Sequence, residues 1–245
     1  MERQLTMSDQ ITITLDDKQV KATAGERLLD VCRREGIEIP TLCDHVDVSS
    51  YGACRLCLVE WDRGDWSKMV TSCNFPVKDG QTFRTNSEKV QRIRNMIMQF
   101  TLARSSNVPE VVELAKKWGV TETKFSKQEE GCILCGNCVR ACTEVVGANA
   151  IGFSERGKDR RVSPPLNAEA IDCIGCGSCA YVCPTGFIKV EETATTRKFP
   201  LWNAEFELVY SKKLGQKIPR KQIEFVAERA NLPIEHFEIE ELKKK

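Results

Sequence analysis

Cysteine is the residue type whose number and spacing most clearly carry chemistry in this chain. Of 13 cysteines, all but Cys32 fall into three groups of four. Closely spaced thiolates are metal ligands, and groups of four suit tetrahedral coordination. The three groups are Cys43, Cys54, Cys57 and Cys73; Cys132, Cys135, Cys138 and Cys142; and Cys173, Cys176, Cys179 and Cys183.

The second and third groups share the pattern C-x2-C-x2-C-x3-C, and each cysteine of one recurs 41 positions later in the other. A repeat of this fidelity indicates a duplicated metal-binding unit. The spacing is typical of [4Fe-4S] clusters, whereas structural zinc sites use two C-x2-C pairs. We therefore predict two [4Fe-4S] clusters, with zinc as the alternative.

The fourth cysteine of each run continues into a helix and points away from the loop that holds the first three. The runs resemble those of bacterial two-cluster ferredoxins, in which the fourth cysteine ligates the other cluster. The resemblance implies two crossed ligand sets. Cluster one would be bound by Cys132, Cys135, Cys138 and Cys183, and cluster two by Cys173, Cys176, Cys179 and Cys142.

The first group has the spacing C-x10-C-x2-C-x15-C. Its centre, Gly52 to Glu60, resembles the cysteine loop of plant-type [2Fe-2S] ferredoxins, which have a shorter first spacer. We predict one [2Fe-2S] cluster bound by all four, with zinc or a purely structural set as alternatives. Cys43-Asp44-His45 has the C-x-H form of a Rieske centre, but no second Cys-His pair exists, so we interpret His45 as a surface or second-shell residue. Cys32 is interpreted as structural.

Other chemistry finds little support. The sequence has no G-x-G-x-x-G dinucleotide motif and no phosphate-binding P-loop, and its two histidines lack partners for acid–base work, so we expect no catalytic residues. The net charge of +1 argues against a nucleic-acid partner. The longest apolar run, Cys179 to Cys183, is far below the ~18–20 residues of a membrane span. With no leader peptide evident, we expect a cytoplasmic protein.

The elements that must position the cysteines form an α+β protein of four segments. Residues 9–86 predict a [2Fe-2S] domain, with a hairpin at 11–22, a helix at 25–35 and strands at 58–61, 68–72 and 82–85. The other segments are a helical spacer at 87–130, the duplicated 2[4Fe-4S] ferredoxin domain at 131–190, and a mixed C-terminal extension at 191–245.

The spacer and the extension carry two helical stripes. In the spacer, Ser87 predicts an N-cap for a helix to Ala103 with Val90, Ile93, Ile97 and Phe100 on its buried stripe. In the extension, an aromatic stretch from Phe199 to Tyr210 precedes a helix that begins near Pro219 and carries Ile223, Val226 and Ala230. The aromatic stretch is a candidate docking segment, with burial in the chain's own core as the alternative.

The order of these segments resembles the electron-input subunit of complex I and the small diaphorase subunit of NAD-reducing hydrogenases over about residues 9–190. That resemblance implies a β-grasp fold for the [2Fe-2S] domain. Members of the family usually bind a further cluster in the spacer through an H-x3-C-x2-C-x5-C pattern. Here residues 100–124 contain neither Cys nor His, so we expect that cluster to be absent.

The resemblance implies a non-catalytic subunit of an oxidoreductase complex. It would relay single electrons through one [2Fe-2S] and two [4Fe-4S] clusters, between a flavin subunit that handles NAD(H) and a terminal catalytic subunit. The terminal subunit would be a hydrogenase, a formate dehydrogenase or a heterodisulfide-reductase-like module, and the complex could bifurcate electrons. The alternatives are a free-standing ferredoxin-type carrier and a succinate dehydrogenase type iron-sulfur subunit.

Overall fold

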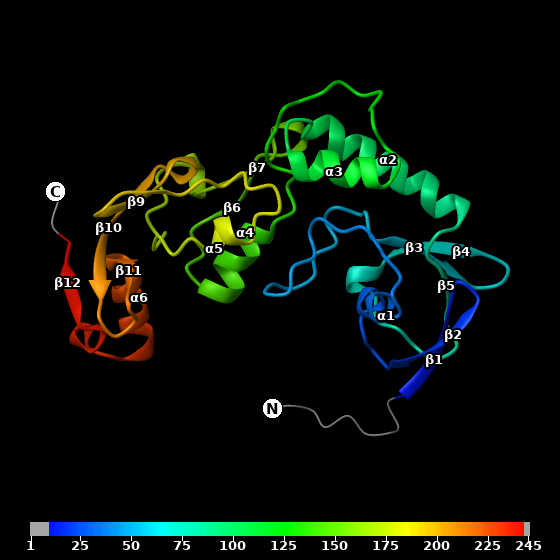
Figure 1. Ribbon diagram of the computed structural model, residues 1–245, viewed down its shortest axis with the longest axis horizontal. Coiled ribbons are helices and arrows are strands. Elements are labelled where there is room, and N and C mark those ends of the chain that lie inside the picture. The colour runs from blue at the N-terminus through cyan, green and yellow to red at the C-terminus, as the bar shows by residue number, and fades with distance from the viewer. Residues whose placement is uncertain (1–9, 243–245) are drawn as a thin grey trace. The chain divides into compact units, whose positions relative to one another are not determined.

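The computed structural model describes residues 10–242, which divide into two compact units (Figure 1). The first contains the chain up to Asp44 and Ser50–Cys135, and the second contains His45–Ser49 and the chain from Gly136 onward. Asp9, the first residue of the predicted [2Fe-2S] domain, and residues 243–245 of the extension lie outside the described residues. Among residues 10–242, no helix has the length and apolar character needed to span a bilayer.

A five-stranded mixed sheet organises the first unit. β1 (Gln10–Leu15) and β2 (Lys18–Thr23) form the predicted hairpin, and β3 (Leu58–Asp62) pairs antiparallel with β4 (Ser67–Thr71). β5 (Thr82–Arg84) lies between β1 and β3, parallel to β1, so the order is β2-β1-β5-β3-β4. This topology supports the expected β-grasp fold.

The helix α1 (Leu28–Arg34) covers this sheet (Figure 1). Leu28, Leu29 and Cys32 of α1 are fully buried against Ile13 and Phe83 of the strands. A fully buried Leu or Phe stabilises the fold by about 1.5–3 kcal/mol, so this core is the main force holding α1 in place.

Two helices form the spacer: α2 (Glu88–Arg104) and α3 (Pro109–Lys117). Ser87 is the N-cap of α2, as predicted, and its Oγ accepts a hydrogen bond from the N–H of Val90 at 3.3 Å. The two helices enclose a second core that includes Met98, Leu102 and Val111.

The second unit begins with α4 (Asn137–Arg140), which continues as a π-helical turn, η3 (Ala141–Val146). A short hairpin of β6 (Gly152–Ser154) and β7 (Arg161–Ser163) follows, and α5 (Ser178–Tyr181) packs against α4. Three 3-10 turns complete the connections between these elements: η2 (Ser72–Asn74) in the first unit, and η4 (Gly157–Asp159) and η5 (Pro165–Asn167) in the second.

The C-terminal extension folds as a second sheet with one helix. Its strands are β8 (Glu191–Glu192), β9 (Thr196–Phe199), β10 (Ala204–Ser211), β11 (Gln216–Pro219) and β12 (Ile239–Glu241), in the order β11-β10-β9-β8 with β12 also paired to β10. The helix α6 (Arg220–Ala230) packs on β10, and the turns η6 (Pro200–Trp202) and η7 (Ile234–Phe237) connect the strands. The fold is therefore α+β, as expected.

The buried face of α2 differs from the predicted stripe. Its buried residues are Val90, Arg94, Met98, Leu102 and Ala103, whereas Phe100 is 53% exposed. Phe100 instead stacks on the ring of Phe125, with 4.4 Å between the centroids. The prediction is confirmed at Val90 and wrong at Phe100, because the carbonyl of Leu58 allows Arg94 to occupy a buried position that apolar periodicity does not select.

The buried face of α6 also differs in part. Ile223 and Ala227 are buried, while Val226 is 41% exposed and Ala230 is exposed. The helix begins at Arg220, directly after Pro219, as predicted. Its N-terminal start was therefore easier to predict than its rotation, since the rotation depends on β10 and Phe237, which are distant in sequence.

Candidate metal centres

The first cysteine group lies in the loop between α1 and β3 and in the turn η2 after β4. Cys43, Cys57 and Cys73 are almost completely buried, and Cys54 is half-buried. The structure brings the four together as two pairs. The backbone N–H of Cys54 donates to Cys43 Sγ at 3.5 Å, and the thiols of Cys57 and Cys73 share a hydrogen bond.

Electrostatics within the Cys57–Cys73 pair favour one thiolate. The hydrogen bond from Cys73 lowers the pKa of Cys57 to about 7, against the effect of burial, and the same bond raises the pKa of Cys73. The pKa of Cys54 is raised by its hydrogen bond with Cys43 and by burial. Since the thiolate is the metal ligand, the hydrogen bond from Cys73 favours the ligating form of Cys57.

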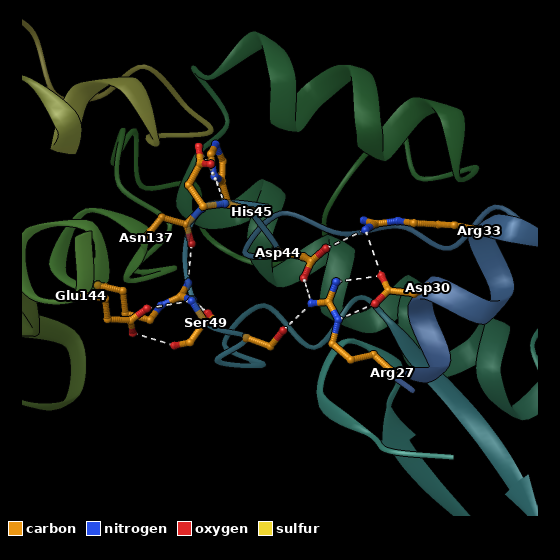
Figure 2. A network of polar contacts seen from close by, with 11 residues as sticks. Arg27, Asp30, Arg33, Asp44, His45, Ser49, Asn137 and Glu144 are labelled. Atoms are coloured by element: carbon orange, nitrogen blue, oxygen red, sulfur yellow. Dashed lines mark hydrogen bonds and ion pairs between the residues drawn. The ribbon is translucent and has the colours of Figure 1, made fainter. Parts of the chain in front are cut away.

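An ion-pair network holds the backbone beside Cys43 (Figure 2). The carboxylate of Asp44, whose side chain is only 5% exposed, pairs with Arg27 at 3.0 Å and with Arg33 at 2.9 Å. Arg27 also donates to Ser50 Oγ at 2.6 Å and pairs with Asp30 at 2.7 Å. Residues of α1 and its N-terminal flank thus fix Asp44 and Ser50 within the first unit.

In the second unit, the segment 45–49 holds the turn that follows Cys142. Both carboxylate oxygens of Glu144 accept hydrogen bonds from Ser49, at 2.8 Å from the N–H and 2.6 Å from Oγ (Figure 2). These bonds lower the pKa of Glu144. Arg140 donates to the backbone oxygen of Ser49 and, at 2.6 Å, to Asn137 Oδ1. Asn137 in turn donates to the backbone oxygen of Val182 at 3.3 Å.

A buried cation lies near the first cysteine group. Arg94 is 5% exposed, and its Nη2 donates to the carbonyl of Leu58 at 2.6 Å. Burial lowers the pKa of Arg94 to about 10, while the nearby thiols of Cys57 and Cys32 act in the opposite direction. The pattern of the sequence did not reveal this residue, because an arginine on a helix is usually solvent-exposed.

The structure gathers cysteines from both halves of the repeat around one cavity in the second unit. Cys142 comes from the first half and Cys173, Cys176 and Cys179 from the second, and all four line the cavity. The thiols are near enough that Cys142, Cys173 and Cys176 each act electrostatically on Cys179. This is the set expected for cluster two.

Backbone amides point at the sulfur atoms of this cavity. The N–H of Ala150 donates to Cys142 Sγ at 3.3 Å, and the backbone of Gly175 hydrogen-bonds Cys173. Burial raises the pKa of Cys142, Cys173 and Cys179, the last to about 12, and so favours the protonated thiols while no metal is bound. Because the ligand is the thiolate, metal binding would release these protons.

The remaining cysteines of the repeat are Cys132 and Cys135 at the end of the first unit and Cys138 and Cys183 in the second. Cys135 and Cys138 are buried, and Cys132 and Cys183 are half-buried. Cys132 Sγ accepts from the N–H of Leu134 at 3.4 Å. Burial opposes ionisation of Cys183, but hydrogen bonds from Thr185 and nearby amides outweigh it and lower the pKa. Their joint ligation of cluster one stays a prediction from the resemblance to two-cluster ferredoxins.

The residues interpreted as structural lie outside these sets. Cys32 is completely buried in α1, and burial raises its pKa to about 12. His45 packs edge-on against Tyr181, with 5.9 Å between ring centroids, and its Nδ1 accepts from the N–H of Asp47 at 3.3 Å. His236 contacts Lys213.

The donor sets fit iron-sulfur clusters better than zinc. Each donor set consists of sulfur alone, and backbone amides are directed at the sulfur atoms of Cys43 and Cys142. Both features are typical of iron-sulfur sites.

Comparison with known protein families agrees with these sites. Residues 8–88 match the model of a 2Fe-2S iron-sulfur cluster binding domain, and residues 131–187 match that of a 4Fe-4S dicluster domain. The chain therefore contains both kinds of ferredoxin domain. The dicluster match supports the prediction of two [4Fe-4S] clusters.

Curated proteins with similar sequences match most of the length of this chain. It is 33% identical over 201 residues to the NADPH-Fe(3+) oxidoreductase subunit alpha of Geobacter sulfurreducens, a match that covers 72% of this chain and 24% of the relative. It is 28% identical over 214 residues to the NADP-reducing hydrogenase subunit HndD of Solidesulfovibrio fructosivorans, covering 74% and 36%. It is also 28% identical to the NADH-ubiquinone oxidoreductase 75 kDa subunit of Reclinomonas americana, covering 80% and 32%.

A solved structure is also similar. One chain of the NAD+-reducing [NiFe]-hydrogenase, crystallised in the H2-reduced state, superimposes with a TM-score of 0.62 at 26% identity, over 72% of this chain and 85% of that one. The predicted resemblance to complex I and hydrogenase subunits is thus confirmed. The chain spans about a quarter to a third of the length of its curated relatives.

Proposed function

We propose that this chain is an electron-transfer subunit of a multi-subunit oxidoreductase, without a catalytic site of its own. It relays single electrons through one [2Fe-2S] and two [4Fe-4S] clusters, between an NAD(H)-flavin subunit and a terminal catalytic subunit. The support comes from the two ferredoxin domains and from relatives named as subunits of NADPH-, NADH- and NADP-linked enzymes.

The observation that carries the proposal is the position of Cys142. It lies in the first half of the repeat but lines the cavity of Cys173, Cys176 and Cys179. Crossed ligation of this kind is the arrangement of two-cluster ferredoxins. Cluster two would then use these four thiolates, and cluster one would use Cys132, Cys135, Cys138 and Cys183.

The two-pair arrangement of the first group suits a [2Fe-2S] cluster, in which each iron takes two protein thiolates. One iron would be held by Cys43 and Cys54, and the other by Cys57 and Cys73, which are the pairs that share hydrogen bonds. The ion pairs of Asp44 would keep the loop of Cys43 in place.

When bound, the clusters would accept and donate electrons one at a time, which suits a flavin that receives two from a hydride. The chain's own residues determine how dry and how polar the surroundings of cluster two are. The buried side chains Ile151, Ile174 and Phe199 exclude water from the cavity of cluster two, and the N–H of Ala150 stabilises the charge on Cys142 Sγ.

The terminal partner is proposed to be a hydrogenase, a formate dehydrogenase or a heterodisulfide-reductase-like module. The alternatives are a free-standing carrier and a succinate dehydrogenase type subunit. Affinity purification of the full chain from its native host distinguishes them. Recovery of a flavoprotein that oxidises NAD(P)H supports the subunit, and recovery of the chain alone supports the carrier.

Serine variants of single cysteines test the ligand sets. The anaerobically purified chain should hold about ten irons and ten acid-labile sulfides. Electron paramagnetic resonance spectra of Cys142→Ser should match those of Cys173→Ser, which shares its cluster, and differ from those of Cys138→Ser. Cys32→Ser, at a cysteine outside every set, is the control for a buried thiol. Spectra of Cys142→Ser that match Cys138→Ser, or zinc without sulfide, would overturn the proposal.

A further inference from the structure

The C-terminal extension packs directly on the loop that carries Cys173 and Cys176. Gly175 has φ +73°, and a Cβ on it would lie 2.7 Å from Phe206 Cδ2 and 3.0 Å from Pro219 Cγ. Arg197 donates to the carbonyl of Gly175 at 3.0 Å, and Lys221 donates to that of Ile171. Side chains of β9, β10, β11 and α6 thus hold this loop.

Two aromatic residues of the extension also form part of the cavity wall. Phe199 and Trp202 line the cavity together with the four thiols, and they are 0% and 1% exposed. The backbone oxygen of Trp202 accepts from the N–H of Ala170 at 3.3 Å, which fixes η6 against the loop before Cys173. With Phe206 also buried, these aromatic side chains belong to the chain's own core, and their burial does not support the docking role expected for them.

The indole N–H of Trp202 is a buried donor without an ordinary hydrogen bond. Among residues 10–242 no acceptor meets the usual distance and angle for Nε1. Cys179 lines the same cavity as Trp202, and its thiol interacts with this N–H. A buried tryptophan N–H usually has a hydrogen-bond partner, and leaving that bond unmade destabilises the folded chain.

We propose that Trp202 donates its indole hydrogen bond to Cys179 Sγ when cluster two is bound, so that the C-terminal extension is part of that cluster's site. The inference rests on the proposed ligation of cluster two. The extension thereby gains a role that neither family match covers, since the dicluster model ends at residue 187.

The hydrogen bond has a defined effect on electron affinity. Reduction adds negative charge to the cluster and its thiolates, and a donor to sulfur stabilises that charge, which raises the reduction potential. In a dry cavity the effect is stronger than in water. Removing the N–H should therefore favour the oxidised cluster by about threefold to tenfold, and a factor of ten is about 59 mV for a one-electron couple.

The test uses the full chain with its clusters, prepared anaerobically with indole-15N tryptophan. Hyperfine spectroscopy of the reduced protein should show a 15N coupling to the cubane whose signal is altered in Cys142→Ser. In Trp202→Phe the coupling should disappear. The reduction potential of that cubane should fall, by about 59 mV if the equilibrium shifts tenfold and by less if it shifts threefold. Trp66→Phe, at a half-exposed tryptophan of β3–β4, should change neither.

Phe199→Leu is the matched control for packing, because it alters the same wall and keeps the N–H. It should retain the 15N coupling. If the unaltered chain shows its cubane signals but no indole coupling, the inference is wrong and the proposed function stands. An unchanged potential of that cubane in Trp202→Phe would likewise overturn the inference alone. A chain without cubane signals would refute the proposed function itself.

Discussion

Alanine at Gly175 is the sharpest way to test how the extension holds the cluster-two loop. The backbone there has φ +73°, which costs a residue with a Cβ about 1 kcal/mol. The new Cβ would also lie 2.7 Å and 2.8 Å from ring atoms of Phe206. Overpacking of this kind costs typically ~1–3 kcal/mol, so we expect Gly175→Ala to destabilise the loop by about 2–4 kcal/mol.

Gly215, in the turn between β10 and β11, offers a control outside the cavity. Its φ is +68°, and a Cβ on it would have no atom within 4 Å, so Gly215→Ala should cost only the backbone term of about 1 kcal/mol. The assay is the rate at which an iron chelator removes iron from the anaerobic protein in mild urea, since that rate follows local opening. The difference of about 1–3 kcal/mol, at about 1.4 kcal/mol per factor of ten, predicts that Gly175→Ala loses cluster two about 5- to 100-fold faster than Gly215→Ala.

A second substitution isolates the contact. Phe206→Leu removes ring atoms that the new Cβ would meet, so the double variant Gly175→Ala, Phe206→Leu should recover part of the lost stability. Equal iron release from Gly175→Ala and Gly215→Ala, or no recovery in the double variant, would refute the packing of β10 on this loop.

Three further substitutions test the first unit. Arg94→Gln removes a buried cation near Cys57 and should lower the reduction potential of the [2Fe-2S] cluster, by about 59 mV for each factor of ten in the equilibrium between its reduced and oxidised forms. Arg94→Lys keeps the charge and should lower the potential less. A redox titration that finds both potentials unchanged contradicts the electrostatic role of Arg94. Burial raises the pKa of Cys32 to about 12 in the folded chain, so the unfolded chain loses this proton first as the pH rises above 9. The free energy of unfolding should therefore fall by up to ~1.4 kcal/mol per pH unit between pH 9 and 12. Denaturant titrations of Cys32→Ala should lack this contribution to the pH dependence. Asp44→Asn weakens two ion pairs with half-exposed arginines and should destabilise the loop of Cys43 by about 1–2 kcal/mol. Iron release from the first cysteine group should then be faster. An unchanged rate would show that the ion pairs do not hold the loop.

The two kinds of ferredoxin domain were the most predictable part of the molecule, because the cysteine spacing that marks each of them is local in the sequence. The strands and helices of the first unit also lie near their predicted bounds, since hairpin turns and caps such as Ser87 act over a few residues. The prediction that Cys142 joins Cys173, Cys176 and Cys179 came from the resemblance to two-cluster ferredoxins, because local spacing cannot relate cysteines that are distant in the sequence.

Contacts between distant segments account for what the sequence did not reveal. Trp202 is one aromatic among several in the sequence, and only the folded chain places it in the wall of the Cys179 cavity. The burial of Arg94 depends on the carbonyl of Leu58, and the exposure of Phe100 depends on Phe125. In each case the partner lies far enough along the chain that periodicity cannot identify it.

The spacer shows how a segment expected to lack a cluster is stabilised without metal. Leu102, Val108, Val111 and Ala115 of the α2–α3 region are buried in one apolar core. Deletion of a buried side chain of this kind typically costs a few kcal/mol, so several together supply the stability that ligand–metal bonds provide elsewhere. The described residues of the spacer are therefore stabilised mainly by the burial of apolar side chains, and its helix α2 also by the Ser87 cap.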